Sequence, residues 1–170
     1  AQVGPGPKWA QGPSEPWAQK WAQGPSGPMG RIRCPLRCLI GPELKKEGKG
    51  LLHWIFNENG KIKGYNKAIW GGITTLELSK VIEYCINHNI GGLYHITNGE
   101  SISKYDLLNL IKREFKLNKI EIIKDSSIIY DRSLISERSD INYNFSSYDK
   151  MISELNLFYS INKDLYSYRF

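Results

Sequence analysis

The stretch Ile69–Lys80, with the sequence IWGGITTLELSK, and the nearby stretch Gly91–Ile96, GGLYHI, carry most of the information about the fold. Within the first stretch, Thr74-Thr75-Leu76-Glu77 fits a capping box, in which a threonine hydroxyl and a glutamate three residues later satisfy each other's free backbone N–H groups. The sequence therefore predicts a turn, a helix that begins at these threonines, and an end to that helix at Gly91-Gly92.

Apolar residues recur in this helix at spacings of three and four, which places them on one face. They are Leu78, Val81, Ile82, Cys85 and Ile86, while Glu77, Lys80, Glu83 and Asn87 are expected on the opposite, solvated face. The following residues Leu93–Thr97 have the short apolar character of a buried strand, and Asn98-Gly99 is typical of a turn.

A second helix and a second strand follow this unit. The residues Ser103–Asp106 offer a helix cap, and the helix then carries an apolar stripe made of Leu107, Leu108, Ile111 and Phe115. Weak alternation of apolar residues over Lys119–Lys124 predicts another strand. Helices and strands in alternation indicate an α/β fold.

The first 30 residues differ in composition from the rest of the chain. They consist mainly of Pro, Gly, Ala, Gln, Ser and Trp, and the heptapeptide KWAQGPS of residues 8–14 is repeated at 20–26. Prolines remove helix donors and few large apolar groups are present, so we expect a disordered low-complexity region over 1–30. A folded lobe is expected over 31–158, with a C-terminal tail over 159–170.

The net charge of +6 comes largely from the N-terminal part of the chain. Residues 1–50 carry eight Lys or Arg against three acidic residues, whereas residues 51–170 carry fifteen against fourteen. Because the folded part is close to neutral, the charge pattern gives no basic surface for nucleic acid, and no nucleic-acid partner is predicted.

Cysteine usage and hydropathy indicate a cytoplasmic protein. The three cysteines are odd in number, which favours reduced thiols, and Cys34-Pro35-Leu36-Arg37-Cys38 resembles only half of a metal site. The three histidines show no paired spacing, so no metal site is predicted. No apolar run approaches the ~18 residues of a membrane span, and no signal peptide is recognisable, so no membrane association is expected.

Seven segments follow one another in an order that indicates a family. They are Leu36–Glu43, Gly50–Phe56, Ile69–Ile82, Gly92–Ile96, Ser101–Leu108, Asp131–Leu134 and Tyr148–Leu155. From about Arg31 to Phe158 the chain thus resembles the C-terminal portion of an extended short-chain dehydrogenase/reductase acting on nucleotide sugars. The resemblance is to the dTDP-4-dehydrorhamnose reductase-like branch and the NAD-dependent epimerases in particular.

The resemblance implies hydride transfer with NAD(P) for the full-length family, but the parts that carry this chemistry are missing from this sequence. They are a Gly-rich turn after the first strand and a Tyr-x-x-x-Lys pair. Tyr159-Ser160-Ile161-Asn162-Lys163 has the right spacing, but it follows every matched segment, whereas the family's pair precedes them. We therefore expect a small helix-strand substrate lobe that lacks most of the Rossmann sheet, with no catalytic and no cofactor-binding residue.

Arg132 is the main candidate for substrate binding. A guanidinium can hold a diphosphate through two parallel hydrogen bonds, and the resemblance places an arginine and a serine, here Ser133, near the nucleotide sugar. The alternative is a surface arginine paired with Asp131 or Glu137.

Four further candidates flank the chain segment that the resemblance places beside the sugar pocket. Tyr65 and Trp70 offer aromatic faces suited to a sugar or base, with core packing as the alternative. Gly71 and Gly72 permit close backbone approach to a ligand, or they only make the turn before the helix.

Two functions follow from these observations. The first is a fragment of a nucleotide-sugar reductase or epimerase that retains part of the nucleotide-sugar site and is inactive alone. The second is a non-catalytic binding or interaction module with the N-terminal repeat as a flexible arm. Under the first interpretation an unpaired sheet edge would be exposed, and we expect self-association through it.

Overall fold

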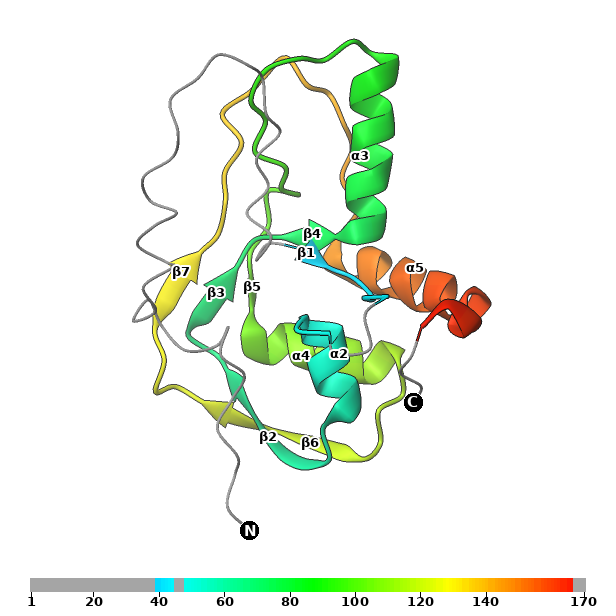
Figure 1. Cartoon of the computed structure of the whole chain (residues 1–170). Coiled ribbons are helices and arrows are strands. Elements are labelled where there is room, and N and C mark those ends of the chain that lie inside the picture. The colour runs from blue at the N-terminus through cyan, green and yellow to red at the C-terminus, as the bar shows by residue number, and fades with distance from the viewer. Residues whose placement is uncertain (1–38, 45–47, 167–170) are drawn as a thin grey trace.

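Short strands and helices alternate along the chain, which confirms the predicted α/β class (Figure 1). The structure is a computed structural model, and it describes residues 39–44 and 48–166. The repeat predicted to be disordered in residues 1–30, together with Arg37 and the Cys34–Cys38 pair, lies outside these residues.

Seven strands, four α-helices and one 3-10 turn are present in the described residues. In chain order they are β1 Leu39–Ile40, α2 Leu51–Asn57, β2 Gly60–Tyr65, β3 Ala68–Trp70, β4 Ile73–Thr74, α3 Thr75–Asn87, β5 Ile102–Ser103, α4 Lys104–Glu114, β6 Ile120–Asp125, β7 Tyr130–Arg132, α5 Tyr148–Ile161 and the 3-10 turn Lys163–Leu165.

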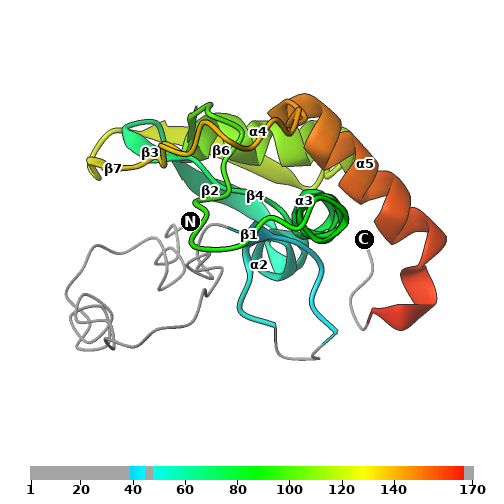
Figure 2. The same ribbon diagram turned by 90° about the horizontal axis from the view of Figure 1, so that it is seen from above.

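The strands form three small sheets. Strands β2 and β6 pair in parallel over six residues, and β1 pairs in parallel with β4. The third sheet has the order β5-β3-β7, in which β3 is antiparallel to β5 and parallel to β7. Seen from above, α4 and α5 lie on one side of β2 and β4, and α2 lies on the other (Figure 2).

Helix α4 is central to the core. Its cap is the predicted one, since the Ser103 hydroxyl accepts a hydrogen bond from the Asp106 backbone N–H at 3.1 Å. All four residues of its predicted apolar stripe are buried, and the helix contacts β2, β6 and α5. The ring of Phe115 lies 5.1 Å from that of Phe56 in α2, centre to centre. The stripe therefore joins both sides of the strands in one core.

Helix α3 begins where the sequence predicted, and its buried face is the predicted one only in part. The Thr74 hydroxyl accepts a hydrogen bond from the Glu77 backbone N–H at 3.1 Å. The Glu77 side chain, expected in solvent, is only 1% exposed, whereas Ile82 and Ile86 are 38% and 70% exposed. The prediction was right for Val81 and Cys85, which are buried, and wrong for Glu77, Ile82 and Ile86. Glu77 finds hydrogen-bond partners in the interior, which offset the cost of burying a carboxylate.

An asparagine, not the glycine pair, ends α3. Asn89 adopts a positive φ of 52°, its N–H donates to the Ile86 carbonyl, and the Ile90 N–H donates to the Cys85 carbonyl. These two bonds form a Schellman motif, which asparagine tolerates because it enters the left-handed region more readily than most residues. The helix therefore ends four residues before Gly91.

The predicted strand Leu93–Thr97 is not formed, whereas the predicted strand at Lys119–Lys124 is present as β6. In the first segment Tyr94, Ile96 and Thr97 are buried, in keeping with its predicted apolar character. No strand ladder includes this segment in the described part of the chain. A short apolar segment alone does not make a strand, because a ladder also needs a neighbouring strand.

The C-terminal helix runs beyond the expected lobe boundary at residue 158. Helix α5 is capped by Ser147 and continues to Ile161, and Tyr159 is only 1% exposed. Residues 159–166 thus contribute to the core, since Tyr166 is also buried and stacks on Tyr159.

Across the residues that the structure describes, none of the helices combines the length and apolar character that a membrane crossing requires.

Candidate functional site

Pairing of β3 with β7 brings most of the predicted site residues together. The parallel register places Ala68 opposite Tyr130 and Trp70 opposite Arg132. Because successive side chains of a strand point to opposite faces, Tyr130 and Arg132 share one face and Asp131 lies on the other. Arg132 and Asp131 therefore lie on opposite faces of the sheet.

Arg132 is held against an aromatic ring. Its guanidinium carbon lies 4.6 Å from the centre of the Tyr130 ring, a cation–π arrangement. Within residues 39–44 and 48–166, neither Asp131 nor Glu137 forms an ion pair with Arg132, so the alternative of a paired surface arginine is not what the structure contains. Arg132 is half-buried, and its guanidinium lies over the Tyr130 ring.

A second cation approaches the same ring. The Lys104 ammonium lies 5.1 Å from the centre of the Tyr130 ring, and the lysine is only 6% exposed. Lys104 opens α4 directly after Ser103, which pairs with Ile69 in β3. In the order β5-β3-β7, the strands β5 and β7 are the two edges of the sheet. Lys104, which follows β5, and Tyr130, which lies in β7, therefore come together from opposite edges. We refer to Lys104, Tyr130 and Arg132 as the Tyr130 cluster.

The Asp131 carboxylate forms a hydrogen bond to the backbone of Ser133. The Ser133 backbone N–H donates to the Asp131 carboxylate at 2.8 Å, and hydrogen bonding by Ser133 lowers the pKa of Asp131. The aspartate therefore fixes the turn that leaves β7, on the face away from the Arg132 guanidinium. The predicted assistance of Arg132 by Ser133 stays a prediction.

Gly71 is a point of close approach between two segments of the chain. A Cβ at this position would lie 2.8 Å from the Ser133 Cα and 2.9 Å from the Leu134 N. The Gly71 carbonyl also accepts a hydrogen bond from the Thr97 hydroxyl at 3.2 Å. Gly72 is buried between β3 and β4. The glycine at 71 thus lets the strand ends meet.

The two aromatic candidates pack internally. Trp70 is 7% exposed and its ring lies 5.8 Å from that of Tyr148 in α5. Tyr65 is 9% exposed and forms a small cluster with Ala68, against which Tyr130 packs. Trp70 is therefore packed in the core, which is the alternative that the sequence left open for it. Tyr65 lies beside the Tyr130 ring, which packs against the Tyr65–Ala68 cluster.

Sequence reasoning missed Lys104 and Tyr130. Tyr130 stands two positions before Arg132, and this spacing on a strand puts both on one face, so the signal was present. Lys104 carried no such signal, because its place depends on the pairing of β5 with β3, which the sequence does not specify.

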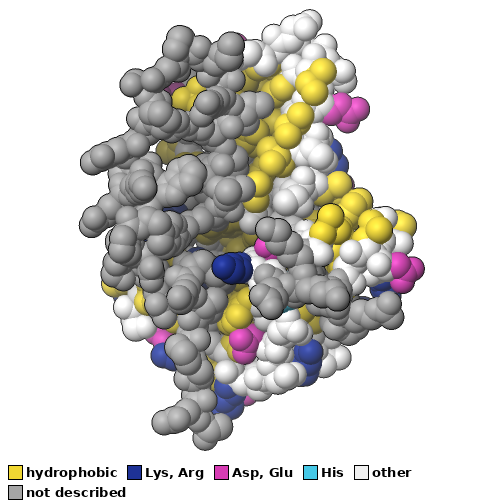
Figure 3. All heavy atoms as spheres, in the orientation of Figure 1, with side chains coloured by type: hydrophobic (Ala, Val, Ile, Leu, Met, Phe, Trp, Pro, Cys, Tyr) yellow, Lys and Arg dark blue, Asp and Glu magenta, His cyan; other side chains and the backbone are white. Residues whose placement is uncertain are grey.

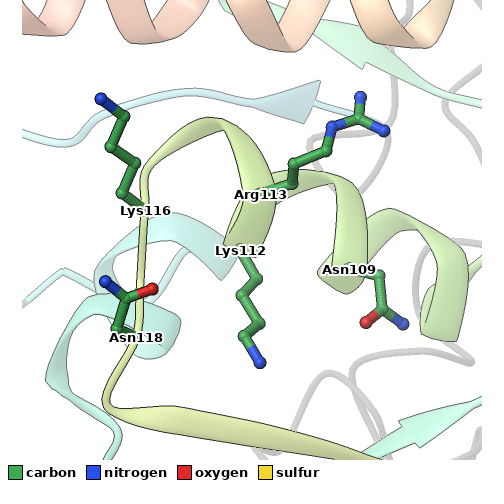
Figure 4. A pocket seen from close by; sticks show the side chains of 5 residues that line it. All are labelled: Asn109, Lys112, Arg113, Lys116 and Asn118. Carbon is green, nitrogen blue, oxygen red and sulfur yellow. The ribbon is translucent and has the colours of Figure 1, made fainter.

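Two surface depressions lie away from the cluster, near the C-terminal half of α4. The larger, of about 360 Å³, is lined by Asn109, Lys112, Arg113, Lys116 and Asn118, whose side chains spread apart (Figure 4). The second, of about 320 Å³, shares Asn109 and Arg113 with it. Arg113 is paired with Asp149 and Glu114, and cations here complement the negative end of the helix dipole. These depressions therefore lack convergent ligand-binding groups.

The described residues do not fit NAD(P). The glycine pair between β3 and β4 is buried, and the space beside Gly71 is filled by the Ser133 backbone. The phenol of the Tyr159-x-x-x-Lys163 pair lies in the core, with its ring 6.0 Å from Phe56 and 5.3 Å from Tyr166. Neither feature can serve the pyrophosphate or the hydride-transfer step in this part of the chain.

Solved structures of nucleotide-sugar enzymes share the fold of this chain. A dTDP-4-dehydrorhamnose reductase from Bacillus anthracis str. Ames, in complex with NADP, is similar with a TM-score of 0.57 and 16% identity over 71% of this chain and 45% of its own. The dTDP-4-dehydrorhamnose reductase from Yersinia enterocolitica gives a TM-score of 0.53 and 17% identity over 69% and 46%.

An epimerase is similar as well. The UDP-N-acetylglucosamine 4-epimerase from Methanobrevibacter ruminantium M1, in complex with UDP-N-acetylmuramic acid, gives a TM-score of 0.50 and 12% identity over 73% of this chain and 44% of its own. This chain thus spans under half the length of each of these proteins. No protein-family model and no curated protein matches the sequence. The likeness confirms the predicted α/β fold, which matches a part of each of these solved structures.

Proposed function

We propose that this chain is the nucleotide-sugar-binding part of a reductase or epimerase of the extended short-chain dehydrogenase/reductase type. It binds the diphosphate of its ligand through Arg132, and it does not carry out hydride transfer by itself. The proposal includes no step through NAD(P), because the described residues do not fit that cofactor.

The arrangement of Arg132 is the observation that carries this proposal. A guanidinium stacked on an aromatic ring keeps its N–H donors directed outward in one plane, which suits bidentate binding of phosphate oxygens. The guanidinium carbon of Arg132 lies over the Tyr130 ring, 4.6 Å from its centre, and Arg132 forms no ion pair with an acid among the described residues. Its charge is therefore available to an anion.

The solved structures support the ligand class. The Bacillus anthracis reductase is named for a dTDP-sugar, and the Methanobrevibacter epimerase was solved with a UDP-sugar. A dTDP-sugar and a UDP-sugar both contain a nucleoside diphosphate, the group that Arg132 is suited to hold.

Calorimetric titration of the full chain with UDP and dTDP tests the binding proposal. Arg132→Ala should weaken binding by about 1 to 3 kcal/mol, the cost of losing charge-assisted hydrogen bonds. Arg113→Ala is the matched control, since it removes an arginine from α4 at the depression shown in Figure 4. Binding that is absent, or equal in Arg132→Ala and the wild type, removes this site.

Incubation with NADPH and a dTDP-4-keto sugar tests the second half of the proposal. The full chain should oxidise no more NADPH than a sample without protein. Turnover above that background would show that hydride-transfer groups are present, and the proposed division of labour would then be wrong.

A further inference from the structure

We infer that Thr97 is a positioning residue for the Arg132 site, because its buried hydroxyl holds the backbone that lies against the end of β7. This inference rests on the proposed function, and it adds a residue that was not among the predicted site residues. Thr97 does not touch the ligand in this account. It acts through the backbone of Gly71 and Ser133.

The ends of β3 and β7 lie side by side at the proposed ligand site. Trp70, the last residue of β3, is opposite Arg132, the last residue of β7, in the parallel register. The next residues, Gly71 and Ser133, approach closely, since a Cβ on Gly71 would lie 2.8 Å from the Ser133 Cα. The backbone at Gly71 therefore cannot move towards β7 without displacing Ser133, which directly follows Arg132.

The Thr97 hydroxyl holds the backbone at Gly71. It donates a hydrogen bond to the Gly71 carbonyl at 3.2 Å and accepts one from the Gly99 backbone N–H at 3.2 Å. Because the hydroxyl both donates and accepts, its orientation is set by these two partners. Thr97 is only 3% exposed, so loss of its hydroxyl would leave the Gly71 carbonyl without this partner in a place that water does not readily reach.

The Asp131 carboxylate holds Ser133 from a second side. It accepts a hydrogen bond from the Ser133 backbone N–H at 2.8 Å. Arg132 therefore lies between a residue that accepts this bond and a residue that donates it and also packs against Gly71. Contacts within the chain thus fix the backbone of Arg132, and a side chain on a fixed backbone loses less conformational freedom when it binds a ligand.

The test is a double-mutant cycle on the UDP affinity of the full chain, measured by calorimetry. Thr97→Val keeps the branched shape of the side chain and removes the hydroxyl. It should lower the UDP affinity about threefold to tenfold, the change expected for the loss of one neutral hydrogen bond. In the Arg132→Ala background the same substitution should leave the affinity unchanged, because Thr97 acts through Arg132.

Two further variants complete the cycle. Thr97→Ser keeps the hydroxyl and should restore the wild-type affinity. Thr75→Val is the matched control, because it removes a threonine hydroxyl from an exposed position at the start of α3 and should leave UDP binding unchanged.

A relaxation measurement on the ¹⁵N-labelled wild type tests the inference without a variant, and so applies even if Thr97→Val does not fold. The backbone amides of Asp131–Ser133 should be rigid without UDP, with order parameters of about 0.85. Order parameters below about 0.6 that rise only when UDP is added would show that the ligand orders Arg132, and would overturn the inference.

Two results of the cycle would also overturn the inference. One is a folded Thr97→Val variant that binds UDP as tightly as the wild type does. The other is an equal loss of affinity in the wild-type and Arg132→Ala backgrounds, since a general loosening of the fold has that effect. In either case weaker UDP binding by Arg132→Ala leaves the proposed function standing. Absence of UDP binding to the wild type removes both the inference and the proposed function.

Discussion

The Glu77 carboxylate accepts a hydrogen bond from the backbone N–H of Ser146 at 3.0 Å, and thereby joins α3 to the segment that leads into α5. The same carboxylate accepts from the Tyr143 hydroxyl at 3.3 Å and lies 3.6 Å from the Lys80 ammonium. Lys80 in turn pairs with Glu154 in α5 at 2.5 Å. One buried carboxylate therefore organises three segments of the lobe.

Replacing Glu77 should destabilise the fold. Glu77→Ala leaves the Ser146 N–H and the Tyr143 hydroxyl without their acceptor in a buried place, at a cost of about 3 kcal/mol. Glu83→Ala, at an exposed position of the same helix, should change the free energy of unfolding by less than about 0.5 kcal/mol. Urea unfolding measures both, and equal midpoints for the two variants would show that the Glu77 contacts are unimportant.

The Tyr143 hydroxyl should lose its proton at a higher pH than an ordinary tyrosine does. Burial, followed by the charge of Glu77 and the hydrogen bond to it, raises the pKa of Tyr143 to about 12 from the ordinary tyrosine value of 10.0. Because the folded state holds this proton more tightly, the contribution to stability is complete below pH 10 and is lost as the pH rises through about 12. Ultraviolet difference titration of the wild type against Tyr143→Phe measures this step. A phenol that ionises near pH 10 contradicts it.

Gly71→Ala should destabilise the lobe. The new Cβ would meet backbone atoms of Ser133 and Leu134 below 3.0 Å, and backbone cannot move as readily as a side chain. We expect a loss of roughly 1 to 3 kcal/mol in thermal or urea unfolding. Gly91→Ala is the control, because no atom lies within 4 Å of a Cβ there. If the two variants are equally stable, the segment after β3 and the turn after β7 can move apart to admit the Cβ without loss of folding free energy, which contradicts the prediction.

Self-association through a sheet edge stays a prediction, and the exposed apolar side chains of α3 offer a second surface through which two copies could associate. Hydrophobic side chains lie along the surface over this helix, where Ile82 and Ile86 are exposed one turn apart (Figure 3). Ile86→Glu should lower the apparent mass in sedimentation equilibrium, since it places a charge on this surface. Asn87→Glu adds the same charge one position away, as the control. A wild-type monomer at all concentrations contradicts the prediction.

The sequence predicted the elements that local chemistry determines. Threonine and serine caps placed the starts of α3 and α4, and the α4 stripe identified its buried face. The alternation in β6 was also sufficient, although its partner β2 was not predicted, because parallel pairing depends on residues far apart in the chain.

The rest depends on tertiary contacts. Nothing local marks Glu77 as buried, since its partners Ser146 and Tyr143 lie more than 60 positions away. The candidate site was half predictable: Arg132 follows from its motif, whereas Lys104 reaches the same ring only through the β5-β3-β7 order. Composition and periodicity do not encode that order.

A nuclear magnetic resonance titration of the full ¹⁵N-labelled chain with UDP tests the binding site most directly. The backbone amides of Tyr130–Ser133 and Ala68–Trp70 should shift in a saturable way in the wild type, and these shifts should disappear in Arg132→Ala. Contradiction would come from shifts confined to the α4 depression around Lys112 and Lys116, or from no shift at all at saturating UDP.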